Sequence, residues 1–148
     1  MKRIILAGLI GMVLTGCGDE SSEKKVTEEM LVGGWECTAT TQEADWKNGL
    51  FQDYSTPVNQ GKSLIVYIKE NDALFVKLPD SDRKIKLDFK KLNDEYSNTF
   101  DDTKITGYNK LEYISDDEFK MTTETSQMFT DSEYNKKNKT LMHCTRMN

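Results

Sequence analysis

From Met30 onward, apolar and polar residues alternate with a period of two over most of the chain, which predicts strands rather than helices. The clearest case is the stretch 83–90. Its residues Ile85, Leu87 and Phe89 are predicted to share one apolar face, while the charged residues between them point to water. In so acidic a chain we interpret these lysines as a solvated strand face and not as a nucleic-acid site.

Further runs of this kind follow one another at intervals of about eight to twelve residues, with acidic turns between them. Asn71 and Asp72 are predicted to form a hairpin turn, because both residue types tolerate a left-handed backbone. The spacing predicts an all-β fold, a single small antiparallel barrel or sandwich of about eight strands. Beyond residue 31, a short helix is expected only over Glu43–Gln52. The predicted strands lie within 31–40, 64–68, 74–78, 83–90, 94–100, 103–114, 118–125 and 139–147.

Residues 1–17 have the three parts of a secretory signal peptide. Lys2 and Arg3 open the segment, and the uncharged apolar run Ile4–Leu14 follows. This run has about 11 residues, whereas a membrane-spanning helix needs about 20. A short buried helix, the alternative, would show polar residues at helical spacing, and none precedes Thr15.

The segment Leu14-Thr15-Gly16-Cys17 resembles the lipobox, the processing signal of bacterial lipoproteins. The resemblance implies that the chain is cut between Gly16 and Cys17 and that Cys17 carries palmitate on its sulfur. It also implies two or three acyl chains in all, which anchor a protein firmly to a membrane. In this family, an aspartate directly after the lipidated cysteine favours retention of the lipoprotein at the inner membrane. Here that residue is Gly18, so the resemblance implies an outer-membrane lipoprotein that faces the periplasm.

These features divide the chain into a signal peptide (1–16), a lipidated cysteine with a flexible tether (17–29) and a β-barrel domain (30–148). The tether is predicted because residues 18–29 contain one aliphatic side chain, Val26, and bury too little apolar area to become ordered. The alternative is a short helix over Glu28–Leu31. Loss of Lys2 and Arg3 changes the net charge from −5 to −7, so the mature protein has little attraction of its own for an anionic lipid surface.

The remaining cysteines, Cys37 and Cys144, form an even pair in a secreted protein, and a disulfide is the expected arrangement. Two buried thiols are an alternative, whereas a redox pair would need a Cys-x-x-Cys spacing. If Cys37 lies opposite Cys144 in an antiparallel pair of the first and last strands, Trp35 falls opposite Arg146. A guanidinium over an indole ring is a favourable cation–π contact, so one register satisfies both pairs. Such pairing of the chain ends is how a barrel closes.

The residues Gly33-Gly34-Trp35, together with Arg146 near the end of the chain, resemble the lipocalins and the wider calycin group. Those barrels have a Gly-x-Trp on the first strand and a late arginine that packs across the tryptophan. The resemblance rests on about four residues, and the family's helix before the last strand is not evident. It implies a small closed barrel with structural roles for Trp35 and Arg146. The alternative is that Trp35 anchors the core of another β-sandwich.

The sequence offers little catalytic or metal chemistry. His143 is the single histidine, and its strand position puts it on the face opposite Cys144. The chain has no HExxH, no G-x-S-x-G and no phosphate-binding glycine loop. The acidic clusters lack an EF-hand pattern and fit solvated turns. We therefore expect no enzyme, no cofactor, no metal and no nucleic-acid partner.

Two functions remain. The first is a non-catalytic binding module for another protein, of the inhibitor, immunity or assembly type, with a basic partner suited to the acidic surface. Trp46, Phe51 and Tyr54 are candidate contacts, with the alternative that they cap one end of the barrel. The second is a lipocalin-like carrier of a small apolar ligand, and a purely structural envelope component is a third. A carrier's cavity would be lined by Tyr108, Tyr113, Met121, Met128 and Met142.

Overall fold

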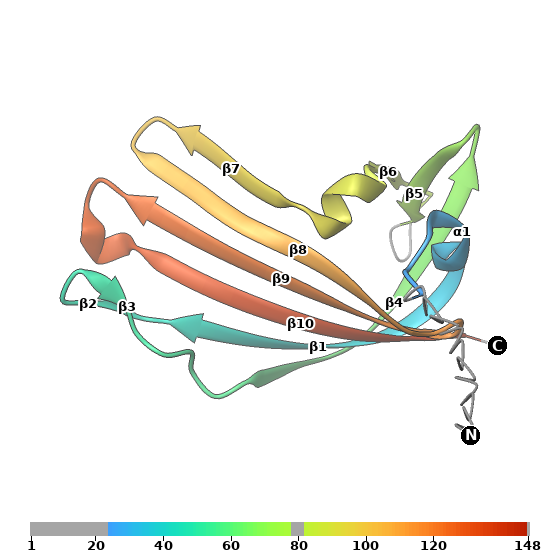
Figure 1. Cartoon of the computed structure of the whole chain (residues 1–148), viewed down its shortest axis with the longest axis horizontal. Helices are drawn as coiled ribbons and strands as arrows, with labels where there is room; N and C mark the ends of the chain where they lie inside the picture. The colour runs from blue at the N-terminus through green and yellow to red at the C-terminus, as the bar shows by residue number, and fades with distance from the viewer. Residues whose placement is uncertain (1–23, 78–81, 148) are drawn as a thin grey trace, which may run out of the picture.

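The computed structural model describes residues 24–77 and 82–147, so the predicted signal peptide and Cys17 lie outside the described residues. Eight antiparallel strands form one sheet that curls into a half-barrel, in the order β6-β5-β4-β1-β10-β9-β8-β7 (Figure 1). This confirms the predicted all-β fold and the pairing of the first and last strands. The strands are β1 (Gly33–Ala44), β4 (Val58–Glu70), β5 (Ala73–Lys77), β6 (Lys84–Leu87), β7 (Glu95–Phe100), β8 (Thr103–Ser115), β9 (Glu118–Phe129) and β10 (Lys136–Arg146).

Five short elements complete the described fold. They are α1 (Glu28–Leu31), the hairpin of β2 (Trp46–Lys47) and β3 (Leu50–Phe51), and the 3-10 helices η1 (Phe89–Asn93) and η2 (Ser132–Tyr134). The helix expected over Glu43–Gln52 is wrong. Asn48 and Gly49, with φ of 55° and 82°, close a tight turn there, and strands flank it on both sides. Asn71 and Asp72 do form the predicted hairpin turn, with φ of 48° and 59°.

The barrel is open between β6 and β7, which follow each other in the chain and form the two edges of the sheet. The stretch 83–90 is a strand only as far as Leu87, because the Asp88 carboxylate accepts from the Lys90 N–H (3.2 Å) and starts η1. Leu87 and Phe89 still pack against the core, but Ile85 is 52% exposed. Within β6 the predicted alternation is confirmed, because Ile85 and Leu87 lie opposite Val76 and Leu74 of β5, but Ile85 is exposed at the edge of the sheet and the strand does not continue to Phe89.

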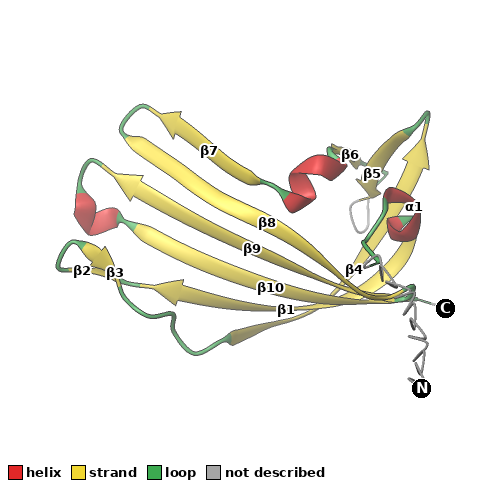
Figure 2. Ribbon diagram, in the orientation of Figure 1, coloured by secondary structure: helices red, strands yellow, loops and turns green. Residues whose placement is uncertain are grey.

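The hydrophobic core lies at the end of the sheet where α1 packs (Figure 2). Trp35 and Phe119 are fully buried and meet edge to face, with ring centroids 4.7 Å apart. The Trp35 indole N–H donates to the Leu31 carbonyl (2.7 Å), which satisfies the buried polar atom and ties α1 to β1. The buried cluster contains Val26, Leu31, Trp35, Cys37, Tyr67, Leu74, Phe119, Met142 and Cys144.

The predicted register between β1 and β10 is confirmed, with Trp35 opposite Arg146 and Cys37 opposite Cys144. The two cysteines form a disulfide with their Cα atoms 4.1 Å apart. The Arg146 guanidinium lies 4.4 Å from the centroid of the Trp35 ring. It also donates to the carbonyls of Met30 (2.7 Å) and Val32 (3.0 Å), so one side chain joins the last strand to the segment before the first.

Residues 24–29, which the sequence assigned to the flexible tether, include side chains that pack against the fold. Val26 is 8% exposed and belongs to the core, and the Thr27 hydroxyl accepts from the Met30 N–H (3.1 Å) at the start of α1. Lys69 on β4 pairs with Glu28 (3.1 Å) and Glu29 (2.8 Å). Glu28–Leu31 is thus the short helix considered as the alternative, while residues 18–23 of the predicted tether lie outside the described part.

Arg146→Ala should destabilise the fold by about 2–4 kcal/mol, because the variant loses the contact with Trp35 and leaves two carbonyls without their charged donor. Lys62→Ala is the matched control, since its ion pair with Glu36 is exposed and exposed pairs contribute about 0–1 kcal/mol. Urea unfolding followed by tryptophan fluorescence measures both. Equal losses of unfolding free energy in the two variants would contradict the role given to Arg146.

Candidate functional site

The long strands of the sheet extend well beyond the core. β1, β4, β8, β9 and β10 have 11 to 13 residues each, or about 40 Å at the usual rise per residue. Figure 2 shows them running from α1 to the far end, where η2 and the β2–β3 hairpin lie. This far half has little to bury, so its faces are the main surface available for recognition.

On the face that continues from the core, the far half of the sheet is polar. The Thr123 hydroxyl donates to the Asn109 side-chain carbonyl (2.9 Å), and the hydroxyls of Tyr96 and Thr125 are hydrogen-bonded (2.7 Å). A Cβ added at Gly107 would lie 2.6 Å from the Tyr96 hydroxyl oxygen, so the glycine makes room for that ring. These threonine, asparagine and tyrosine side chains suit a polar partner better than an apolar ligand.

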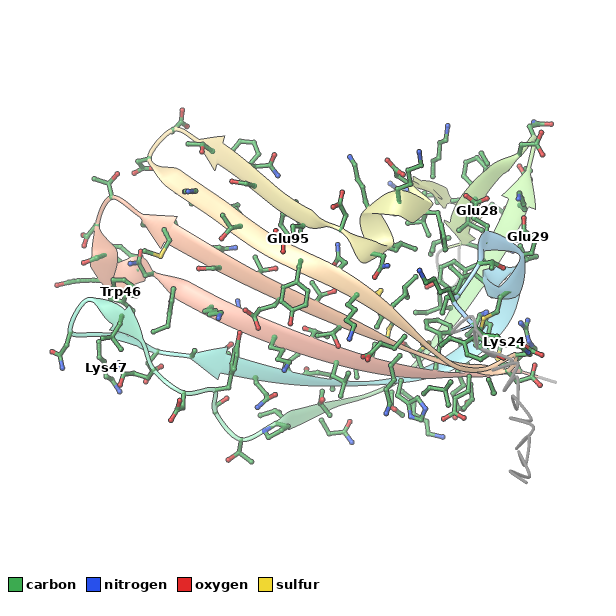
Figure 3. All side chains as sticks on the ribbon, viewed as in Figure 1. Lys24, Glu28, Glu29, Trp46, Lys47 and Glu95 are labelled. Carbon is green, nitrogen blue, oxygen red and sulfur yellow. A yellow bond between two sulfur atoms is a disulfide. The ribbon has the colours of Figure 1, made fainter. Side chains whose placement is uncertain are left out.

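The three predicted contact residues lie in the β2–β3 hairpin and in the segment that follows it. Trp46 and Phe51 form an edge-to-face pair across the β2–β3 hairpin, with centroids 4.8 Å apart, and both are half-buried. Figure 3 shows Trp46 and Lys47 at the opposite end of the molecule from Lys24. The Tyr54 ring lies on the opposite face of the sheet from the core, where it meets two lysines of β10, and one of these, Lys137, lines a groove together with Phe51.

Tyr54 sits in a charged cluster. The ammonium groups of Lys137 and Lys139 lie 5.3 Å and 5.8 Å from its ring centroid. Lys137 also pairs with Glu124 (2.8 Å), and both of these side chains are largely buried. Burial raises the pKa of the Glu124 carboxyl, but the hydrogen bond and charge of Lys137 outweigh it, and the net pKa is lowered. Glu124 is therefore ionised at neutral pH.

The Tyr54 hydroxyl is buried and has no hydrogen-bond partner within the described residues. Burial raises the pKa of Tyr54 well above its usual value of 10.0, and the Glu124 carboxylate raises it further. Beside this cluster is an open groove of about 300 Å³, which runs across the sheet from the hairpin to β7. Its lining residues are Phe51, Glu95, Thr106, Gly107, Tyr108, Glu124, Ser126 and Lys137.

Sequence reasoning missed Glu95, Glu124 and Lys137. They belong to three different strands and meet only through the registers of β7 with β8, β8 with β9 and β9 with β10. The turn at Asp101-Asp102 was a signal for the first of these registers, because a two-residue hairpin turn fixes which residues face each other. The register of β8 with β9 follows from the two-residue turn between Ser115 and Glu118, whereas no such short turn joins β9 to β10.

A second groove, of about 750 Å³, opens at the core end beside the part of β8 that β7 does not reach. The Lys24 ammonium donates to the Tyr113 hydroxyl (3.4 Å), which in turn donates to Asp116 (2.6 Å). The hydrogen bond from Tyr113 and the charge of Lys24 lower the pKa of Asp116. The groove is lined by Lys24, Lys25, Val26, Phe89, Asn93, Lys110, Leu111, Glu112 and Tyr113.

The residues predicted to line an apolar cavity do not come together. Met121 and Met142 pack in or against the core, and Tyr113 lines the groove at the core end. Tyr108 lines the smaller groove, and Met128 lies opposite Lys104 on the same face as Tyr108. The five side chains therefore occupy both faces of the sheet.

Three further observations concern chemistry and attachment. His143 Nε2 lies 2.5 Å from the Glu118 carboxylate, on the face away from the disulfide. Over residues 24–77 and 82–147, no three histidine, cysteine or acidic side chains gather in a way that would hold a metal ion. Among the same residues, no helix has the length and apolar character needed to cross a membrane.

Comparison with known proteins gives no match: no protein family, no curated protein and no solved structure is significantly similar to this chain. The resemblances to the lipobox and to the lipocalins stay predictions from the sequence.

Tyr54→Phe should leave stability at pH 8 within about 1 kcal/mol of wild type, because the hydroxyl it removes has no partner. At higher pH the variant should be the more stable. The folded pKa of Tyr54 exceeds the unfolded value of 10.0, so stability is lost as the pH rises above 10 and the unfolded tyrosine ionises. Urea unfolding at pH 8 and about 10.5 measures the difference. Tyr134→Phe, at an exposed ring, should show no such gain.

Proposed function

We propose that this protein is a membrane-anchored bacterial envelope lipoprotein that acts as a non-catalytic binding module for another protein, of the inhibitor, immunity or assembly type. The observation that supports this most is the sheet itself. Its strands continue far beyond the core, and the far half presents hydrogen-bonding and charged side chains that do not belong to the hydrophobic core. Such surfaces are the usual basis of protein recognition, with aromatic residues such as Trp46 and Phe51 at the margin.

Charge supports a basic partner. The mature chain would have a net charge of −7 after loss of Lys2 and Arg3 from a chain of net −5. A charge of this sign steers a cationic protein toward the surface and speeds association at low salt.

The anchor is tested by metabolic labelling with a palmitate analogue. Wild-type protein should take up the label, and Cys17→Ala should lose it, because Cys17 is the proposed acylation site. The control is Cys37→Ala, which removes a disulfide cysteine and should keep the label. Label retained by Cys17→Ala would refute the lipoprotein assignment.

The binding function is tested by capture from envelope extract and from toxins of competing strains, with the full chain as bait in detergent. We expect a basic protein whose affinity falls steeply between low and moderate salt, because exposed charges are screened within about 8–10 Å. Trp46→Ala and Phe51→Ala should weaken capture, because both aromatic side chains lie at the margin of the proposed binding surface. Metal-dependent hydrolysis of an envelope substrate would overturn the proposal.

The groove at the core end supports a second candidate, a carrier of a small ligand. Its floor of Val26, Phe89 and Leu111 is apolar, and lysines stand at its rim. A volume of about 750 Å³ is within the range of small-molecule sites. Co-purification of a lipid or other apolar small molecule, with no protein partner, would favour this carrier over the binding module.

A further inference from the structure

The two edges of the sheet are protected to different degrees. A sheet edge has unpaired N–H and C=O groups that can pair with another chain, and proteins commonly block this with lysines, prolines or bulges. On β6, Lys84 and Lys86 occupy two of the four positions. On β7, whose sequence is EYSNTF, there is no lysine, no proline and no register shift.

β7 pairs with β8 and with no other strand in the described part of the chain, and it lies at the margin of the sheet in Figure 1. Five of its six residues are exposed, and Phe100 is 61% exposed. An edge that is uncovered and also rich in β-forming residues is available for pairing.

The register shows which groups are free. The Asn109 N–H donates to the Asp94 carbonyl (2.9 Å), and hydrogen-bonded pairs alternate along an antiparallel ladder. Tyr96, Asn98 and Phe100 therefore direct their N–H and C=O groups toward β8, and Glu95, Ser97 and Thr99 direct theirs outward. The Glu95 N–H is bonded to the Asp94 side chain (2.9 Å). The outward N–H groups of Ser97 and Thr99 remain for a partner strand.

Charge selects the partner. Asp94 and Glu95 stand at one end of the edge, and Asp101 and Asp102 stand at the other, with uncharged residues between them. Lys104 on β8 lies opposite Thr99 and offsets one of these four acids. A second copy of this chain would bring acidic ends together whichever way it ran, and facing like charges destabilise strand pairs.

We propose that β7 is a docking edge that takes up an extended, basic-flanked segment of the partner protein as a ninth strand. Main-chain bonds to Ser97 and Thr99 give affinity, as in other cases of strand addition. The acidic ends give register and select for lysine or arginine at both ends of the segment. This inference rests on the proposed binding function and names the kind of segment that the partner supplies.

The probe for this site is the peptide Lys-Lys-Val-Thr-Val-Thr-Val-Lys-Lys, added to the full chain in detergent and followed by fluorescence anisotropy and amide hydrogen exchange. We expect binding at low salt, with exchange slowed at the amides of Ser97 and Thr99 and unchanged on β6. The same peptide with glutamates in place of its lysines should not bind. Equal binding of the two peptides would overturn the proposal.

Ser97→Pro removes one outward N–H without touching the ladder to β8, a position that tolerates proline in an edge strand. It should weaken binding of the lysine peptide about tenfold or more, as the loss of one hydrogen bond and the added ring predict. Ser97→Ala keeps the N–H and should bind as wild type does. A folded Ser97→Pro variant with unchanged affinity would refute the site.

A peptide N-methylated at each of its five central residues, so that both of its edges are blocked, gives the same test from the other side and does not depend on how the variant folds. It should fail to bind, because it cannot donate to the outward carbonyls, and full binding would refute strand addition. The proposed binding function and the proposed docking edge at β7 can be refuted independently of each other. A captured envelope protein that binds Ser97→Pro as tightly as wild type would reject the β7 edge and keep the binding function, whereas peptide binding without any envelope partner would do the reverse.

Discussion

The structure depends on the contact between Arg146 and Trp35. The indole packs on Phe119 within the core, and the guanidinium covers it while it holds the carbonyls of Met30 and Val32. The disulfide lies two residues farther along both strands and keeps the same pair of strands in register. Because these contacts join the two ends of the described chain, the first and last strands lie at the centre of the sheet, and its open edges are formed from the middle of the sequence.

That arrangement explains why the molecule has two unlike ends. Aromatic and sulfur-containing residues of the core are concentrated where β1, β9 and β10 meet α1, while the same strands continue as polar sheet for several more residues. An open sheet can present both faces and an edge, which a closed barrel cannot do. The geometry therefore gives recognition more surface than it gives a ligand cavity.

Much of this was predictable, and the reasons for the failures are specific. In an antiparallel pair of strands, the numbers of residues that face each other have a constant sum. The pairs Cys37–Cys144 and Trp35–Arg146 have the same sum, so both could be placed from the sequence. Val26 was assigned to a tether, since one aliphatic residue in a polar segment shows its burial only when the surface that receives it is known. Glu124 and Lys137 were missed because their meeting depends on several registers at once. The open edge was missed because alternation predicts strands but not which hairpins pair.

The position of the N-terminal segment has a mechanical consequence. Tension applied at Lys24 would pass through α1 and Arg146 to the pair β1–β10, which the Cys37–Cys144 bond joins covalently. Two strands linked in this way cannot be peeled apart by one end of the chain. Load between the two ends of the chain would instead pass through the disulfide, so that the strands between Cys37 and Cys144, β6 and β7 among them, carry none of it. The core end of the sheet would thus bear the tension, and the far half would stay unloaded.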